Sequence, residues 1–431
     1  MTWLVHRDEL TVEQSRAVEL NPKEHRLILG SPGSGKTIVL LHRARHLVDE
    51  YRIPPKRYRI FVFTRTLKAY IRSALEDLDL PDECVTTFDA WCLDYYRAHI
   101  DGRVPRDARN RRLDFDSIRR AVWEETRSLA GSERLYDFVM VDEGQDLDAR
   151  IFEIIKAVAQ HVTVFMDRKQ QLYETGADEQ AILTALGLRR CNLTLLQAYR
   201  CSPYIVQVAA SFIRDPSERE AFIRQHPPMK IARQTPLLYL ADRADDERAH
   251  LIEMVRNRID KNDRMAILFP TRRHVYGYAR ALQEAGLEVE VPGQAGRKKS
   301  DAAKPPEIPT LDFSTPLPKL MPYPSAKGLT FDTVLMPRLV LRLFPNLEPE
   351  RLEQWLFVGI TRATRWVYFS TINDNRFMFL ERFQNLERLK QVAIKLSEDL
   401  LTENTTYVSN RLPEAGAGKE FDDGDDLSDL F

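Results

Sequence analysis

The sequence has no apolar run that approaches the roughly 20 residues needed to cross a bilayer. Its four cysteines show no C-x-x-C spacing, which argues against structural zinc and favours a reducing compartment. The first ten residues include His6, Arg7, Asp8 and Glu9, a composition that differs from that of a signal peptide. We therefore expect a cytoplasmic protein.

The chain also lacks a large net charge: its formal net charge is −1 at pH 7. Any contact with nucleic acid would need a local basic patch. One candidate is the arginine-rich stretch Arg103–Arg120, and the alternative is a solvated arginine face whose charge is offset by acids elsewhere. The residues alone favour neither interpretation.

What the 431 residues do contain is a repeated alternation of short apolar runs with longer amphipathic segments, over a length that suits two or three domains. Such runs are typical of parallel sheets covered by helices, so we predict the α/β class. The expected strands are Arg26–Leu29, Arg59–Thr64, Phe138–Val141, Val162–Met166, Arg264–Phe269, Thr333–Met336 and Trp366–Ser370. The expected helices are about Thr37–Asp49, a stretch from Thr64 to Leu78, Val275–Ala285 and about Leu386–Leu401.

Two segments interrupt this pattern. Val291–Pro324 is rich in proline and lysine and is predicted to be a linker or loop. The last residues, Glu420–Phe431, are acidic and have neither a helical nor a strand period, which predicts a disordered tail.

The segment Gly30–Thr37 (GSPGSGKT) fits the phosphate-binding pattern G-x-x-x-x-G-K-[ST]. Its glycines let backbone N–H groups point inward around phosphate oxygens, and the helix that follows adds its dipole. An expected strand before the loop and a helix after it supply the context that the motif requires. The residues predicted to hold the phosphates and Mg²⁺ are Gly33, Ser34, Gly35, Lys36 and Thr37.

A second motif, the acidic pair Asp142-Glu143, follows the apolar run Phe138–Val141. Asp142 is expected to hold Mg²⁺ together with Thr37, and Glu143 to take a proton from the attacking water. The two motifs predict a hydrolase of ATP or GTP, but they leave open what the energy does.

The residues around these motifs resemble the boxes of superfamily 1 helicases of the UvrD/Rep type. Asp142–Asp146 (DEGQD) is similar to the D-E-x-Q-D box, and the other boxes occur in the family's order over about residues 10–370. They are Leu10–Val18 for the Q motif, Phe63-Thr64 for motif Ia, Thr87–Cys92 for Ib, Asp167–Tyr173 for III, Ala198–Cys201 for IV, Lys327–Asp332 for V and Val358–Ala363 for VI.

The resemblance implies two RecA-like domains with ATP in the cleft between them. The first would cover residues 1–195, with a small helical insertion at about 93–134. The second would cover 196–400, with the linker at about 291–324, and 401–431 would form the tail.

The resemblance also implies roles in ATP hydrolysis. A phosphoryl group in transfer spreads negative charge, which an arginine stabilises. The matching positions are Arg200 and Arg362 as arginine fingers, Gln170 as the sensor of the γ-phosphate, Gln14 at the adenine edge, Tyr199 stacked on adenine and Gly328 at the nucleotide.

Nucleic-acid contacts in the family come from motifs Ia, Ib and III, where aromatic rings stack on bases of any sequence. The matching residues are Phe63, Thr64, Thr87, Phe88 and Tyr173. For Phe63 and Phe88, burial in the core is the alternative. Backbone contacts and stacking distinguish DNA from RNA poorly, so single-stranded DNA is expected and RNA stays open.

The chain departs from the family pattern in several places. Met166 replaces a glycine of motif III, and Thr330 replaces a glutamate of motif V. The family's tryptophan shortly after the motif III tyrosine is missing, because Tyr173 is followed by Glu174-Thr175-Gly176. The family's large accessory insertions are also essentially missing, which predicts a compact motor.

The leading expectation is an ATP- and Mg²⁺-dependent 3′→5′ translocase or helicase on single-stranded DNA, as a monomer or within a hetero-complex. The alternative is a DNA-sensing regulatory ATPase that does not unwind and instead controls a partner, such as a nuclease in a repair or defence complex. The acidic tail that ends in Phe431 is interpreted as a docking peptide, a nucleic-acid mimic for the protein's own groove, or a solubilising tail.

Overall fold

The computed structural model describes residues 3–107, 111–129, 134–167, 176–195, 201–226, 234–293, 311–344, 347–373 and 377–397. Within these ranges the chain forms two six-stranded parallel sheets, one from residues up to 195 and one from residues after 236. We call the parts built on them the first unit (3–195) and the second unit (201–397). None of the described helices combines the length and the apolarity that a membrane crossing requires.

The first sheet has the strand order β3-β2-β4-β5-β1-β6, and all its neighbouring strands are parallel. Its strands are β1 (Arg26–Gly30), β2 (Tyr58–Val62), β3 (Val85–Thr87), β4 (Tyr136–Val141), β5 (Ala159–Met166) and β6 (Leu193–Leu195). Its helices are α1 (Val12–Val18), α2 (Lys36–Tyr51), α3 (Arg65–Arg72), α4 (Phe88–His99), α5 (Phe115–Thr126), α6 (Ala149–Val158) and α7 (Glu179–Leu186).

Successive strand residues of this sheet face opposite layers of helices. Ile28 packs with residues of α1, α2 and α3, whereas Leu27 and Leu29 pack with residues of α4 to α7. Because both faces are covered, the strands are apolar almost throughout, which is the continuous pattern expected of a buried parallel sheet.

The second sheet has the order β12-β7-β11-β10-β8-β9, again parallel throughout. Its strands are β7 (Leu237–Ala241), β8 (Met265–Phe269), β9 (Lys319–Pro322), β10 (Phe331–Met336), β11 (Ala363–Ile372) and β12 (Ala393–Leu396). Its helices are α8 (Pro203–Ala210), α9 (Pro216–Arg224), α10 (Ala244–Asp260), α11 (Arg272–Glu284), α12 (Pro349–Ile360) and α13 (Leu380–Arg388).

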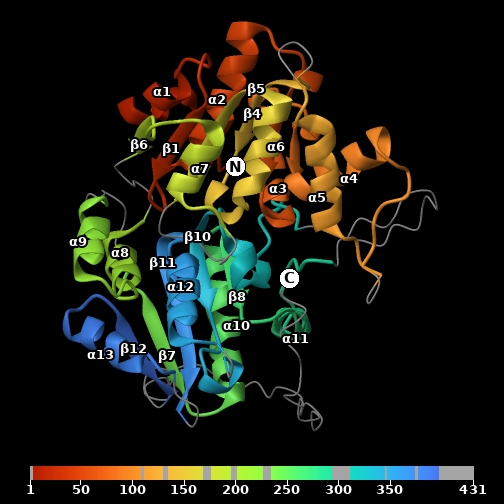
Figure 1. Ribbon diagram of the computed structural model, residues 1–431. Coiled ribbons are helices and arrows are strands. Elements are labelled where there is room, and N and C mark those ends of the chain that lie inside the picture. Colours follow the sequence, from red (N-terminus) through yellow and green to blue (C-terminus); the bar gives the residue numbers. More distant parts are fainter. Residues whose placement is uncertain are drawn as a thin grey trace.

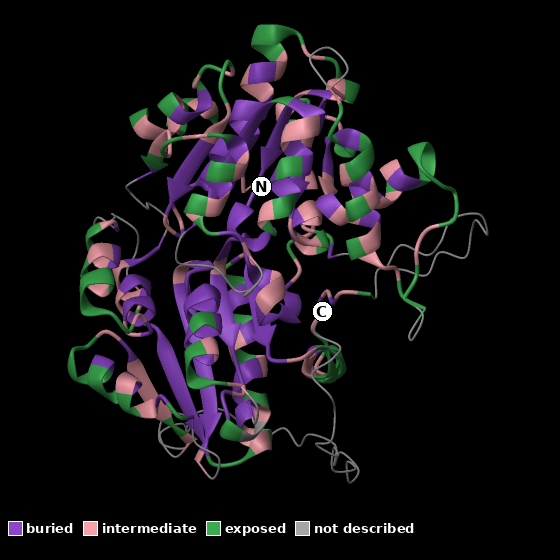
Figure 2. Cartoon of the chain, viewed as in Figure 1, coloured by how far each residue is buried: buried purple, intermediate pink, exposed green. Residues whose placement is uncertain are grey.

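The two units stack so that the second sheet continues below the first, as Figure 1 shows. Figure 2 shows that the strands of both sheets are buried, while the helices turn exposed residues outward. One apolar cluster runs through both units and includes Ile28 of the first sheet and Leu268 of the second. The arrangement confirms the predicted fold class: α/β, with two parallel sheets flanked by helices and consistent with two RecA-like domains.

The prediction that Val291–Pro324 is a linker or loop is wrong at its end. Lys319–Pro322 forms the edge strand β9, which pairs with β8, and Tyr323–Ala326 forms a buried 3-10 turn. A four-residue strand is too short to give a periodic signal, and proline is tolerated where an edge strand ends. Residues 294–310 lie outside the described part of the chain.

The predicted helix at Leu386–Leu401 is also wrong in its bounds. Helix α13 begins at Leu380 and ends at Arg388, and Ala393–Leu396 then forms β12 beside β7. Lys390 has φ 56°, a left-handed conformation that turns the chain out of the helix. The strand depends on a partner more than 150 residues away, which local periodicity does not reveal.

Candidate active site

The phosphate-binding loop lies between β1 and α2, where the sequence places it. Gly33 and Gly35 have φ values of 81° and 82°, in the left-handed region that favours glycine. A Cβ added to Gly35 would lie 2.6 Å from Nε2 of Gln14, so space also excludes a side chain there. No side chain caps the first turn of α2, whereas Thr64 caps α3. The first N–H groups of α2 are therefore available for an anionic ligand.

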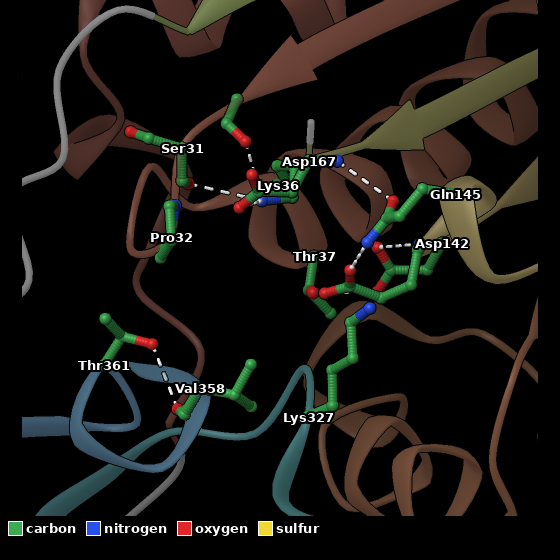
Figure 3. A network of polar contacts seen from close by, with 12 residues as sticks. Ser31, Pro32, Lys36, Thr37, Asp142, Gln145, Asp167, Lys327, Val358 and Thr361 are labelled. Atoms are coloured by element: carbon green, nitrogen blue, oxygen red, sulfur yellow. Dashed lines mark hydrogen bonds and ion pairs between the residues drawn. The ribbon is translucent and has the colours of Figure 1, made fainter. Parts of the chain in front are cut away.

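Lys36 extends along the inside of this loop. Its Nζ donates to the carbonyl oxygens of Gly30 at 2.9 Å and Ser31 at 3.2 Å, and it forms an ion pair with Asp167 at 3.4 Å (Figure 3). The ammonium group is thus fixed at the loop, in the place where a phosphate would need a positive charge.

Thr37 and Asp142 bring a hydroxyl and a carboxylate together. Thr37 Oγ1 donates to Asp142 Oδ2 at 2.8 Å, and both side chains are buried. Oxygen ligands of this kind suit Mg²⁺, which binds proteins through one or two side chains and takes its other ligands from phosphates and water. The buried hydroxyl of Ser34 has no hydrogen-bond partner among the described residues, which also fits a loop that receives further polar ligands.

A chain of hydrogen bonds fixes the second acid of the pair. Glu143 has φ 52° and begins the 3-10 turn Gly144–Asp146. Gln145 donates through Nε2 to Glu143 Oε2 at 2.5 Å and accepts at Oε1 from the backbone N–H of Asp167 at 3.0 Å (Figure 3). Gln145 therefore ties the ends of β4 and β5 together and orients the Glu143 carboxylate.

The two neighbouring carboxylates differ in proton affinity. Burial, with the charge of Glu143 beside it, raises the pKa of Asp142 to about 7. Burial also acts to raise the pKa of Glu143, but the charges of Lys36, Lys327 and Arg362 outweigh it and lower the pKa. Glu143 is therefore ionised at neutral pH, as a proton acceptor must be.

Lys327 reaches this site from the second unit. Its Nζ forms a buried ion pair with Asp146 at 2.7 Å, and its charge acts on Glu143. Figure 3 shows the side chain extending from the second unit toward Asp142. Gly328, with φ 78°, lies against Leu67 of α3, where an added Cβ would come within 3.0 Å of the leucine. The carboxyl edge of the first sheet thus faces the second unit.

Arg362 also comes from the second unit. It follows α12 and is 3% exposed. Its guanidinium donates to the carbonyl oxygen of Val358 at 3.0 Å and to Thr361 Oγ1 at 3.0 Å, and its charge lowers the pKa of Glu143. A predicted arginine finger and the predicted proton acceptor are therefore brought close together.

Gln14 lies beside the loop, as expected for a residue at the nucleotide. Its Oε1 accepts from the backbone N–H of Thr11 at 2.9 Å, and its Nε2 donates to the carbonyl oxygen of Ser34 at 3.0 Å. The side chain ties α1 to the phosphate-binding loop. Whether it also contacts adenine stays a prediction.

The candidate nucleic-acid residues differ in exposure. Phe88 is 2% exposed and packs edge-on against Phe61, which favours the core alternative for this ring. Phe63 is half-buried and packs against the same cluster. The hydroxyls of Thr64 and Thr87 accept from backbone N–H groups and cap α3 and α4. These caps place both threonines at the carboxyl edge of the first sheet.

Several predicted residues lie outside the described part of the chain. They are Gln170, Tyr173, Tyr199, Arg200 and the tail with Phe431. Of the arginine-rich stretch, Arg109 also lies outside it, and Arg119 forms a bidentate pair with Asp89.

Sequence reasoning assigned no roles to Gln145, Asp146, Asp167 and Lys327, although all four form polar contacts in the site. Each lies inside a box that resembles the helicase pattern, and that position in a box is the signal that could have identified them. The pattern does not show which side chains meet, since the Asp146–Lys327 pair joins residues 181 positions apart.

Comparison with known proteins finds one matching family model and similarity to probable DNA helicases. Residues 14–176 match the family model described as an AAA domain. The chain is 23% identical over 333 residues to a probable DNA helicase of Mycoplasma pneumoniae, a match that covers 70% of this chain and 56% of that protein. It is 30% identical over 122 residues to a probable DNA helicase II homolog of Mycoplasma capricolum, which covers 26% of this chain and 17% of the relative.

These findings support a helicase-like P-loop superfamily. The matched region spans about half the length of the first relative and less of the second. A solved structure of the C-terminal domain of a possible DNA helicase from Lactobacillus plantarum WCFS1 matches 46% of this chain and 99% of that domain, with 16% identity and a TM-score of 0.31.

Proposed function

We propose that this protein is an ATP- and Mg²⁺-dependent motor of the UvrD/Rep type that moves 3′→5′ on single-stranded DNA. The order of the sequence boxes and the similarity to probable DNA helicases support the class of motor. The observation that carries the proposal is the buried Lys327–Asp146 pair, because it joins a box of the second unit to the acidic box of the first.

The residues of the site have distinct roles in this proposal. The loop and Lys36 hold the triphosphate, and Thr37 with Asp142 would hold the Mg²⁺ that offsets phosphate charge. Glu143, kept ionised and oriented by Gln145, takes the proton of the attacking water. Arg362 supplies positive charge toward the phosphoryl group in transfer, and Arg200 is proposed as a second such group.

Motion follows from the division of this site between two units. Because Lys327 and Arg362 come from the second unit, the site is complete only when the units are close together. We place the boundary between the two RecA-like domains near residues 195 and 196, with the tail after residue 400. Hydrolysis and product release would alter the spacing of two nucleic-acid footholds and so move the protein along a strand.

ATP hydrolysis titrated with single-stranded DNA, duplex DNA and RNA tests the proposal. We expect the largest stimulation from single-stranded DNA, and no turnover by Lys36→Ala or Glu143→Gln, because these remove a phosphate ligand and the proton acceptor. An ATPase that ignores every single-stranded nucleic acid would sink the assignment. Stimulation by RNA alone would change the substrate and leave the site chemistry in place.

A DNA-sensing regulatory ATPase that does not unwind is the second candidate. Thr330, which stands where the family has a glutamate, is buried, and its hydroxyl has no hydrogen-bond partner in the described part of the chain. Met166, in place of a motif III glycine, is 1% exposed at the end of β5. ATPase stimulated by DNA without strand displacement, with or without partner proteins, would favour this candidate.

A further inference from the structure

His226, from the second unit, contacts the phosphate-binding loop directly. It follows α9 and is 8% exposed. Its Nε2 lies 3.3 Å from the carbonyl oxygen of Pro32, a residue 194 positions earlier in the chain. No box of the helicase pattern contains this histidine, so the contact is a feature of this chain's own tertiary structure.

The imidazole is held firmly on its other side. Nδ1 lies 2.7 Å from the carbonyl oxygen of Phe222, and the ring lies 4.3 Å from the Phe222 ring. Phe222 in turn packs against Phe357 of α12 at 5.2 Å. Helix α12 leads into Thr361 and Arg362. A continuous set of contacts thus joins the phosphate-binding loop to the helix that presents Arg362.

The number of protons on this ring decides how many of its contacts are hydrogen bonds. Both nitrogens face carbonyl oxygens, which only accept. A neutral imidazole has one N–H, whereas an imidazolium has two. The shorter distance assigns the single proton of the neutral form to Nδ1, so only the imidazolium also donates to Pro32.

We propose that His226 is a positioning residue of the nucleotide site, which braces the phosphate-binding loop through Pro32 and does so as an imidazolium when a polyphosphate is bound. This inference rests on the proposed function. The negative charge of a triphosphate in the loop favours the protonated ring, and the protonated ring holds the loop against the second unit.

The charges around His226 make its protonation depend on a ligand. Burial lowers the pKa of the ring and outweighs the two carbonyl contacts and the carboxylate of Asp167, which act to raise it, so the ring is neutral until a polyphosphate adds negative charge. Asp167 is itself paired with Lys36 at 3.4 Å. A phosphate that engages Lys36 would therefore alter the balance of charge that His226 experiences, and so connects ligand binding to the brace.

The test compares the pH dependence of nucleotide affinity in three proteins. Wild type, His226→Gln and the control His99→Gln are titrated with a fluorescent ATP analogue and Mg²⁺ between pH 6 and pH 8. Glutamine retains an N–H donor but never carries charge. His99 is exposed at the end of α4 in the first unit, so its replacement controls for the loss of a histidine. Thermal unfolding at each pH verifies that all three proteins remain folded.

We expect the ratio of the His226→Gln dissociation constant to that of the wild type to rise from about one at pH 8 to about three- to tenfold at pH 6. Protonation of the nucleotide affects all three proteins equally and cancels in this ratio. A ratio that is flat with pH, as expected for His99→Gln, would overturn the inference while the proposed function stands. A folded wild type that binds no ATP analogue would overturn the proposed function as well.

Discussion

At the scale of single residues, the site gathers charges where water is excluded. Lys36, Asp142, Glu143 and Asp146 are each less than a tenth exposed. Burial of charge is unfavourable unless each group has a partner, and the contacts of Lys36 with Asp167 and of Asp146 with Lys327 provide such partners. The site therefore depends on pairs, and the loss of either member of the Asp146–Lys327 pair should affect the stability of both units.

The Lys327–Asp146 pair gives a prediction at this scale. Lys327→Met should lower the free energy of unfolding by about 3–5 kcal/mol, because it leaves the Asp146 carboxylate buried without its cation. It should also reduce ATP turnover, because Lys36, Lys327 and Arg362 together lower the pKa of Glu143 and one of these charges is lost. Urea unfolding and steady-state hydrolysis measure the two effects.

The matched control is Arg280→Met, which breaks an exposed pair with Glu284 and should change stability by less than about 1 kcal/mol. Replacement of both members by Lys327→Met with Asp146→Leu should recover part of the loss. Equal effects of Lys327→Met and Arg280→Met would mean that the pair across the cleft does not form in solution.

At the scale of elements, helix α3 forms much of the contact between the units. Thr64 caps its start, Leu67 lies under Gly328, and Tyr70 packs edge-on against Phe313 at 5.2 Å. The helix follows directly on the motif Ia residues, so it extends from a proposed nucleic-acid foothold to the second unit. This position suits an element that transmits strand binding to the cleft.

Gly328→Ala tests that contact. The substitution forces a left-handed conformation on alanine and puts a Cβ about 3.0 Å from Leu67. Gly286→Ala is the control, since Gly286 has the same φ of 78° but no atom within 4 Å of an added Cβ. We expect Gly328→Ala to destabilise the protein by about 1–2 kcal/mol more than Gly286→Ala. In a Leu67→Ala background this difference in stability should become smaller, because the leucine that the new Cβ would meet is gone. Equal losses would show that the close contact with α3 is absent.

The packing of α10 on the second sheet gives a prediction in pH. His250 stacks on Tyr239 at 3.8 Å and contacts the Tyr368 hydroxyl at 3.0 Å, and burial lowers its pKa to about 4. Unfolding restores an ordinary pKa near 6.5, so the unfolded chain binds more protons between these values. Stability should therefore fall as the pH drops from about 6.5 to 4, by at most about 3 kcal/mol from this group.

His250→Phe should remove this component and flatten the acid side of the stability curve, as measured by urea unfolding at several pH values. The exposed His99 gives the comparison, because His99→Phe should leave the pH dependence unchanged. An unchanged slope in His250→Phe would contradict the assignment of a neutral, buried imidazole.

At the scale of the whole molecule, the two units share an apolar cluster, and residues of both units form the candidate site. Residues 100–114 connect α4 to α5, and α11 is the one helix that the structure describes between β8 and β9. The resemblance to UvrD/Rep-type helicases implies large accessory insertions, and the described residues contain no such domain at either place. Among the described residues, a motor of the proposed type would have two sheets between which to grip a single strand and few elements with which to hold a duplex.

We therefore expect the purified protein to translocate on single-stranded DNA without unwinding long duplexes processively. Unwinding is measured by the displacement of a labelled strand from a short and from a long duplex, with protein in excess over DNA and under single-turnover conditions. Streptavidin release from the end of a biotinylated strand reports translocation independently of unwinding. Processive separation of long duplexes by the protein alone would contradict the expectation.

The sequence by itself determined the local features of this protein. The pattern GSPGSGKT required a turn with glycines at Gly33 and Gly35, and the apolar run before Asp142 required a buried strand. Such features depend on neighbouring residues, on backbone sterics and on burial, which are all encoded within a few positions. The α/β class followed from the same periodicity.

Only the tertiary structure decided which distant residues meet. Edge strands β9 and β12 exist because β8 and β7 offer hydrogen-bonding edges, and neither has a periodic signal of its own. The pairing of Lys327 with Asp146 and the contact of His226 with Pro32 likewise depend on how two sheets stack. Contacts between units arise from shape and charge summed over many residues, so no local pattern specifies them.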